Sequence, residues 1–193
     1  MKKALFTLLS LFLSVTYLNA QFTKIGGGAG FTSGYLFHEM DYDYNKSGHI
    51  FASAKGIYEI TVPIHVSPSF TMFLPHVLRD PGLDQKTTVN TMMFDINGHY
   101  VFNSLDKMEF YALAGLDIML AFKRDKYVGS EAYKESDNAF GLNVGAGTYF
   151  KLTEQFDIYA EAKYLLSKYD QFMLNAGVLI NLDWLIKHEN TGM

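Results

Sequence analysis

Charged and imidazole side chains recur at alternate positions of long segments that are otherwise apolar. Asp95 and His99 share one parity of one segment, and Glu161 and Lys163 share one parity of another. Alternate residues of a β-strand point to the same face, so each pair would lie together. A histidine beside a carboxylate could support acid–base catalysis, but acyl transfer also needs an activated serine. Asp95 and His99 have no serine at a fitting position, which favours a buried ionic network.

His76 is the best candidate for chemistry on the opposite, apolar face, because its parity in the segment Phe70–Leu78 points outward. Its expected neighbours are Ile60 and the stretch 88–90, which carry neither a serine nor a carboxylate. A histidine without such partners cannot activate a nucleophile in the usual way. We expect His76 to be an interfacial side chain.

Two motifs imitate cofactor sites. The glycines of 26–30 do not complete G-x-G-x-x-G, because Phe31 stands at the third glycine position. They are expected to make room for large side chains inside a sheet. The acidic run 41–45 resembles a calcium loop, but Lys46 and Ala52 replace the required glycine and glutamate. The sequence therefore predicts neither a cofactor nor a metal site.

The stretch 35–44 combines aromatic, histidine and acidic residues without alternation, as expected of a loop. Aromatic residues often anchor binding interfaces. We therefore treat this stretch as the candidate binding loop, with a plain solvated loop as the alternative. Its candidate residues are Tyr35, Phe37, His38, Asp41, Tyr42, Asp43 and Tyr44.

The composition narrows the class of protein. The chain has 193 residues, of which 49% are hydrophobic, 16% aromatic and 19% charged, with a formal net charge of −4. This length corresponds to one domain, and the negative charge argues against nucleic-acid binding. Because the chain has no cysteine, disulfides, thiolate metal sites and cysteine nucleophiles are excluded.

The N-terminal segment has the order of a secretory signal. Lys2 and Lys3 precede the apolar stretch Ala4–Leu18, and the small residue Ala20 ends the segment. This order predicts a signal peptide over residues 1–20. A membrane anchor is the alternative, but the stretch is shorter than the about 20 residues of a spanning helix, and no longer apolar run follows.

Two-residue alternation predicts β-strands throughout the rest of the chain. Within 138–152, for example, Phe140, Leu142 and Val144 alternate with small or polar residues. A soluble sandwich would explain each strand alone, but long strands with aromatic residues near their ends favour a lipid-facing barrel. Eight segments follow the pattern: Phe22–Phe31, Ile57–Ser67, Phe70–Leu78, Thr87–Asn103, Met108–Lys123, Asn138–Leu152, Phe156–Leu166 and Gln171–Ile186.

Short and long connections alternate between these segments. The expected tight turns are 67–69, 104–107 and 153–155, with a short last connection at 168–170. The expected long loops are 32–56, 79–86 and 124–137. Outer-membrane barrels combine short periplasmic turns with longer extracellular loops, so we expect the turns and both termini in the periplasm.

These features resemble the small eight-stranded outer-membrane barrels of the OmpA/OmpX type. The resemblance covers residues 21–186 and rests on the signal segment, the alternating strands and the turns. It implies an all-β, antiparallel, up-and-down transmembrane β-barrel in the outer membrane of a Gram-negative bacterium. A periplasmic tail over 187–193 would follow, although such barrels often end on an aromatic residue of the last strand.

No catalytic motif accompanies this resemblance, so we expect a non-enzymatic protein. It would be a structural scaffold, a surface binding protein or an accessory subunit, with the loops 32–56, 79–86 and 124–137 exposed. The expected partners are outer-membrane lipids, including lipopolysaccharide, and an envelope protein complex, with no nucleic acid and no cofactor.

The inward face of such a barrel would hold the polar residues of the alternating segments. Eight strands enclose only enough space for side chains, and charges there must be paired or hydrated. We expect an ionic plug, with a conducting pore as the alternative. The expected network comprises Glu59, His65, Asp95, His99, Glu109, Asp117, Lys151, Asp157, Glu161 and Lys163.

The rival hypothesis is a lipid A-modifying enzyme with lateral access near Pro63 and Pro75. These prolines would lie nearly level in neighbouring strands joined by the turn at 67–69. Each lacks the N–H that a strand ladder needs, so we expect a bulge or weakened pairing there. Such a gap could admit a lipid tail or form a docking edge.

Overall fold

The computed structural model describes residues 22–34, 49–80, 85–127, 132–182 and 184. These residues form nine strands: β1 Phe22–Thr32, β2 His49–Thr61, β3 Ile64–Phe73, β4 His76–Asp80, β5 Gln85–Ser104, β6 Met108–Tyr127, β7 Tyr133–Lys151, β8 Phe156–Ser167 and β9 Gln171–Asn181. Among the described residues, no helix is long and apolar enough to cross a membrane.

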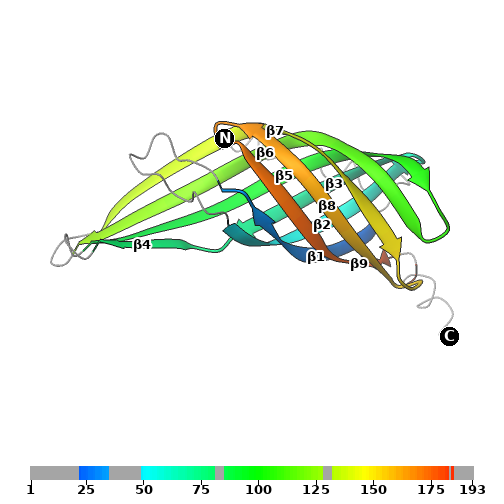
Figure 1. Ribbon diagram of the computed structural model, residues 1–193, viewed down its shortest axis with the longest axis horizontal. Helices are drawn as coiled ribbons and strands as arrows, with labels where there is room; N and C mark the ends of the chain where they lie inside the picture. The colour runs from blue at the N-terminus through cyan, green and yellow to red at the C-terminus, as the bar shows by residue number, and fades with distance from the viewer. Residues whose placement is uncertain (1–21, 35–48, 81–84, 128–131, 183, 185–193) are drawn as a thin grey trace, which may run out of the picture.

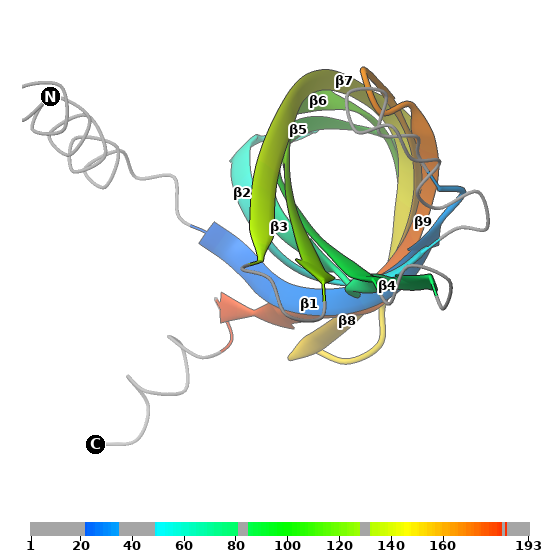
Figure 2. The same ribbon diagram turned by 90° about the vertical axis from the view of Figure 1, so that its left-hand side faces the viewer.

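The strands form one antiparallel sheet that closes on itself. Their order is β3-β2-β1-β9-β8-β7-β6-β5-β4, and the additional pairing of β3 with β5 completes the ring. Figure 1 shows the strands side by side along the barrel, and Figure 2 shows the ring from one end. The predicted antiparallel, up-and-down barrel is confirmed.

Strands β3 and β4 together make a single crossing, so the barrel has the predicted eight passes. Both pair with β5: Met72 lies opposite Met92, and His76 lies opposite Val89. The four residue steps from Met72 to His76 therefore span the same length of the ladder as the three residue steps from Met92 to Val89 on β5. The extra residue is a bulge at Leu74 and Pro75, as expected where a proline cannot donate to the ladder.

Alternation sorts the side chains between the outside and the lumen. Along β7, Phe140 and Leu142 are 76% and 53% exposed, whereas Asn143 between Leu142 and Val144 is 1% exposed. Exposed aromatic residues lie near the strand ends, among them Phe22, Phe31, Phe122, Phe156 and Phe172. An apolar outer band with aromatic rims is the pattern of a lipid-facing barrel.

The lumen is layered, with apolar clusters on either side of a polar layer. The cluster at the end of the long loops comprises Phe51, Phe73, Val89, Met93, Met119, Ala121, Ala139, Leu165, Tyr169 and Met173. The cluster at the end of the short turns comprises Ile57, Tyr111, Leu113, Tyr149, Tyr159 and Leu179. The sequence predicted an inward face of small or polar residues with an ionic plug and did not predict these clusters.

The predicted strand Ile57–Ser67 and turn 67–69 are wrong. The chain turns at Val62 and Pro63, between β2 and β3, and Ser67 to Ser69 lie inside β3. The expected strand therefore joined the end of one strand to the start of the next. An apolar Val–Pro turn carries no polar signal, whereas Ser-Pro-Ser imitates one.

The loops are also shorter than predicted. Residues 49–56 of the expected loop 32–56 belong to β2, and β4 to β7 take up the ends of the loops 79–86 and 124–137. The remaining parts, 35–48, 81–84 and 128–131, lie outside the described residues. The last strand ends at Asn181 rather than at Ile186. The turn regions 104–107, 153–155 and 168–170 connect strands as predicted.

One side of the barrel wall extends well beyond the other. Strands β5, β6 and β7 have 20, 20 and 19 residues, whereas β8, β9 and β1 have 12, 11 and 11. Strand β8 ends opposite Gly141, so residues 133–140 of β7 continue past it. We call β4 and the loop-end parts of β5, β6 and β7 the raised wall; it protrudes at the left of Figure 1.

Inward glycines allow large side chains to lie across the sheet. Gly147 stands between Tyr111 on β6 and Glu161 on β8 in the register. A Cβ at Gly147 would overlap Cζ and Oη of Tyr111 and lie 2.8 Å from the carbonyl oxygen of Ala160. Gly28 and Gly177 similarly leave space for Tyr159, as predicted for the glycines of β1.

We expect Gly147→Ala to lower the free energy of unfolding by about 1–3 kcal/mol, because the added methyl group overpacks the Tyr111 ring. Gly98→Ala is the matched control, since a Cβ there meets only the carbonyl oxygen of Ala114 at 3.6 Å. Heat- and urea-dependent mobility of the folded band in unboiled gels measures both variants. Equal stability of the two variants would contradict the packing argument.

Candidate functional site

The centre of the lumen is organised around the carboxylate of Glu161. Lys55 Nζ donates to Glu161 Oε2 at 2.7 Å, and Tyr111 Oη donates to the same oxygen at 3.0 Å. Both partners come from other strands, and Lys55 on β2 reaches across the lumen. The side chains of Lys55 and Glu161 are each 2% exposed. The ion pair therefore connects opposite walls of the barrel.

An aromatic stack covers this ion pair. The His99 and Tyr111 rings stack with centroids 4.3 Å apart, and Tyr111 and Tyr149 stack at 4.5 Å. His99 Nδ1 and Tyr149 Oη lie at hydrogen-bond distance, 2.7 Å. Lys55 Nζ lies 4.5 Å from the centroid of the Tyr159 ring, a cation–π contact. These rings and the lysine fill the lumen on the turn side of Glu161.

A second ion pair crosses the lumen beside the first. Lys163 Nζ donates to Asp95 Oδ2 at 3.0 Å, Asn97 donates to Asp95 Oδ1, and Asn143 donates to Asn97 Oδ1 at 2.9 Å. Asp117 lies directly opposite Asp95 in the β5–β6 ladder. Its carboxylate is buried and has no hydrogen-bond partner among the described residues. Lys163 is thus the cation that offsets this acidic pair.

Polar residues also line the mouth at the turn end. Lys24 pairs with Asp157 at 2.6 Å and Lys151 with Glu109 at 3.0 Å. Cavities of about 650 and 240 Å³ open there, and both are lined by Lys24, Glu59 and Lys151. Each carboxylate of the two ion pairs has a lysine partner, so this mouth combines paired charges with open cavities.

The ten sequence-predicted lumen residues therefore fall into three groups. Asp95, His99, Glu161 and Lys163 form the central network, and Asp117 lies beside it. Glu109, Lys151 and Asp157 lie at the turn-end mouth. Glu59 and His65 face each other at 3.7 Å near the same mouth. No group of three or more metal-binding side chains occurs among the described residues.

Sequence reasoning missed Lys55, Tyr111 and Tyr149 as members of the site. Lys55 was placed in the loop 32–56, although residues 51–57 alternate in burial as a strand. The two tyrosines were read as uncharged members of the small and polar face. Tyr111 lies opposite the inward Gly147, a pairing that could have identified it, whereas Tyr149 lies opposite Glu109 and Tyr159.

His76 and the two prolines do not form the predicted lateral site. His76 is not lipid-facing: the bulge at Pro75 turns it to the lumen side of the loop end, where its ring lies 5.3 Å from that of His49. Pro63 lies in the turn and Pro75 in the bulge, at opposite ends of β3. The β2–β3 ladder is irregular in two places: the pairs skip from Lys55–Ser69 to Tyr58–Val66 beside Pro68, and the register shifts between Glu59 and Thr61, next to the turn.

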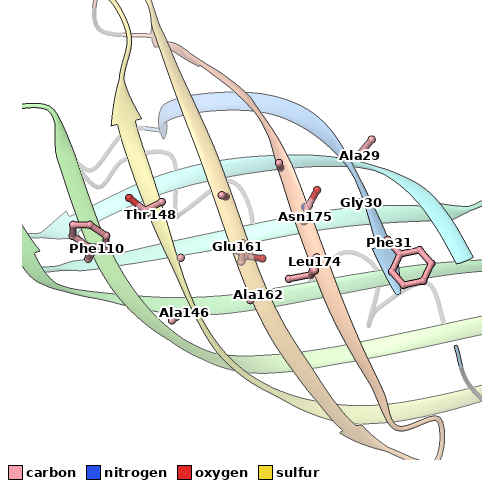
Figure 3. A pocket seen from close by; sticks show the side chains of 13 residues that line it. Ala29, Gly30, Phe31, Phe110, Ala146, Thr148, Glu161, Ala162, Leu174 and Asn175 are labelled. Atoms are coloured by element: carbon pink, nitrogen blue, oxygen red, sulfur yellow. The ribbon is translucent and has the colours of Figure 1, made fainter. Parts of the chain in front are cut away.

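The lipid-facing wall carries a shallow apolar hollow of about 640 Å³. Figure 3 shows Phe110 and Phe31 at its two ends, with Ala146 and Ala162 between them. Glu161 contributes to the lining, but its carboxylate binds Lys55 on the lumen side. The hollow therefore presents no ionised group to the membrane.

The residues of the candidate binding loop lie outside the described residues: Tyr35, Phe37, His38, Asp41, Tyr42, Asp43 and Tyr44.

A closed antiparallel barrel with an apolar outer band and a lumen filled by side chains is the architecture of a small outer-membrane barrel. The outer membrane protein β-barrel domain model matches residues 5–184, and the chain belongs to this family. The predicted family and outer-membrane location are thereby confirmed.

Solved outer-membrane barrels have the same fold. Ail of Yersinia pestis is 20% identical with a TM-score of 0.51, covering 82% of this chain and 99% of Ail. Neisserial surface protein A is 13% identical with a TM-score of 0.59, covering 84% and 99%. The N-terminal barrel of Pseudomonas aeruginosa OprF is 16% identical with a TM-score of 0.52, covering 84% and 99%. A search of curated proteins finds no match.

We expect Glu161→Gln to lower the free energy of unfolding by about 3 kcal/mol, because it leaves the buried Lys55 ammonium without its carboxylate. Glu154→Gln is the control, since Glu154 is exposed within the turn 153–155. Urea titration of the purified barrel in detergent measures both. Adding Lys55→Met to Glu161→Gln should recover part of the loss; a double variant with fully additive losses would refute the coupling.

Proposed function

We propose that this protein is a non-enzymatic outer-membrane scaffold whose lumen is closed and whose raised wall carries the binding surface. The central observation is the pair of ion pairs that cross the lumen, Lys55–Glu161 and Lys163–Asp95, packed against the aromatic stack of Tyr111 and Tyr149. Apolar clusters cover this layer on both sides. The interior is occupied by structural contacts rather than arranged around a substrate.

The side chains of the lumen do not make a catalytic constellation. His99 pairs through Nδ1 with Tyr149 rather than with a serine. Ser67, on the same face of β3 as His65, has an Oγ without a hydrogen-bond partner among the described residues. An acyl-transfer site needs a serine held by its base, which these residues do not provide.

Lipid A is the substrate that the enzymatic alternative would require. Mass spectrometry of lipid A from cells with and without the gene is expected to show the same acyl pattern. A change in that pattern that disappears in a His99→Ala or His76→Ala strain would overturn the non-enzymatic assignment.

We further propose that the short turns and both termini face the periplasm and that the raised wall faces the exterior. This orientation matches the short-turn and long-loop asymmetry of outer-membrane barrels. Under this assignment, the protein contacts outer-membrane lipids, including lipopolysaccharide, along its outer band. An envelope protein complex is a further candidate partner, through the raised wall and the loops at its end.

The absence of native cysteine allows a direct test of this orientation. Tyr133→Cys lies at the tip of the raised wall, where Tyr133 is 60% exposed, and Asp106→Cys lies in an exposed turn at the other end. A membrane-impermeant maleimide should label the first variant in intact cells and the second only after lysis. The reverse labelling pattern would show that the barrel has the opposite orientation in the membrane.

A further inference from the structure

The outward face of the raised wall carries a cluster of exposed basic side chains. All charged side chains on this face, within the described parts of β4 to β7, are basic. The cluster, which we call the basic patch, consists of Arg79 on β4, Lys86 on β5, Arg124 and Lys126 on β6, and Lys134 on β7.

Like charges of the basic patch lie directly opposite one another in the sheet. Lys86 on β5 is opposite Arg79 on one side and Lys126 on the other. Arg124 is opposite Lys134 on β7. Like charges in directly opposed positions destabilise a sheet. None of the five forms an ion pair with any described residue, so the described part of the chain does not neutralise the patch.

Acids of the same strands point to the other face. Lys123 Nζ lies 3.2 Å from Asp125 and 3.7 Å from Glu135, and Thr87 donates to Asp125 at 2.6 Å. The inner face is thus internally paired, while on the outer face no described acid compensates the positive charge. Such segregation points to an anionic partner outside the barrel.

The basic patch lies just beyond the lipid-facing band. Phe122 on β6 lies on the same outward face, next to the patch, and is 43% exposed; Phe94 and Phe140 lie further toward the turn end, where both flank Ile118 in the register. Arg124 follows Phe122 by two residues on β6, a rise of about 7 Å along a strand. Exposed aromatic residues such as Phe122 mark the edges of the hydrocarbon region in outer-membrane barrels. The patch therefore stands at the height of lipid headgroups.

We propose that the basic patch binds phosphate groups of outer-leaflet lipids, with a phosphorylated glycolipid of the lipid A type as the ligand. Lysine and arginine form charge-assisted hydrogen bonds with phosphate oxygens. The acyl chains of the same molecule would pack on the apolar band below, which favours a lipid-held phosphate over a free polyanion. This inference rests on the proposed function, because it requires the raised wall to face the exterior leaflet.

The test compares Lys86→Gln/Lys126→Gln/Lys134→Gln with the charge-preserving control Lys86→Arg/Lys126→Arg/Lys134→Arg. Purified full-length barrels are placed in phosphatidylcholine nanodiscs and titrated with lipid A, dephosphorylated lipid A or free pyrophosphate. Lipid A should bind the Gln variant on the order of 10- to 100-fold more weakly than the wild type, and the Arg variant about equally. Dephosphorylated lipid A should bind all three proteins weakly.

Stability provides a second readout that a merely structural role would not reproduce. In neutral detergent, the Gln variant should unfold at the same temperature as the wild type or higher, because like-charge repulsion is removed. In discs with lipid A, the wild type should become the more stable protein. A Gln variant that is less stable in neutral detergent, or one that binds lipid A as tightly as the wild type, would overturn the proposal.

The remaining outcomes are also decisive. If free pyrophosphate binds as tightly as lipid A, the ligand is a soluble anion and the lipid proposal is wrong. Because a nanodisc offers lipid to both ends of the barrel, this measurement does not depend on orientation. If the protein binds lipid A in nanodiscs but shows the reverse maleimide labelling, the binding site is supported and the proposed orientation is wrong.

Discussion

Closure of the hydrogen-bonded ring is the constraint on which the rest of the structure depends. In the hydrocarbon region no water is present to pair with backbone N–H and C=O groups, so an open sheet edge is not tolerated. The pairing of β3 with β5, from Ile64–Tyr100 to Met72–Met92, removes that edge. Closure with eight crossings also leaves an interior no wider than side chains can fill. The composition of the lumen follows from that limit.

Large and charged side chains fit this narrow interior because glycine stands opposite them. Tyr111 lies across Gly147 and reaches Glu161, whose other partner, Lys55, comes from across the lumen. The buried charges are tolerable because each of these groups has a partner. The apolar clusters pack on either side of this layer. The same contacts that satisfy the charges therefore also fill the interior of the barrel.

The sequence predicted the fold well where two different environments imposed alternation. Segments such as 138–152 alternate because one face meets lipid and the other meets the lumen. Between residues 57 and 67 this signal failed: the apolar Val62 of the turn continued the period, while Ser67 to Ser69 imitated a turn inside β3. The two-residue alternation along a strand assigns each residue to a face of the sheet but does not specify which residues it contacts. The apolar lumen clusters and the role of Lys55 therefore required the three-dimensional register.

The distribution of charge shows why the net charge of the whole chain is a poor guide to the ligands of such a barrel. The formal charge of −4 argues against a polyanionic partner when it is spread over the whole surface. Asp95, Asp117 and Glu161, however, are buried in the lumen, where an external ligand cannot meet them. On β6, Asp125 points into the lumen, whereas its neighbours Arg124 and Lys126 point outward. Since the field at a surface is set by the charges nearest to it and is screened within about 8–10 Å in salt solution, the outward face of the raised wall acts as a cationic surface on an acidic protein.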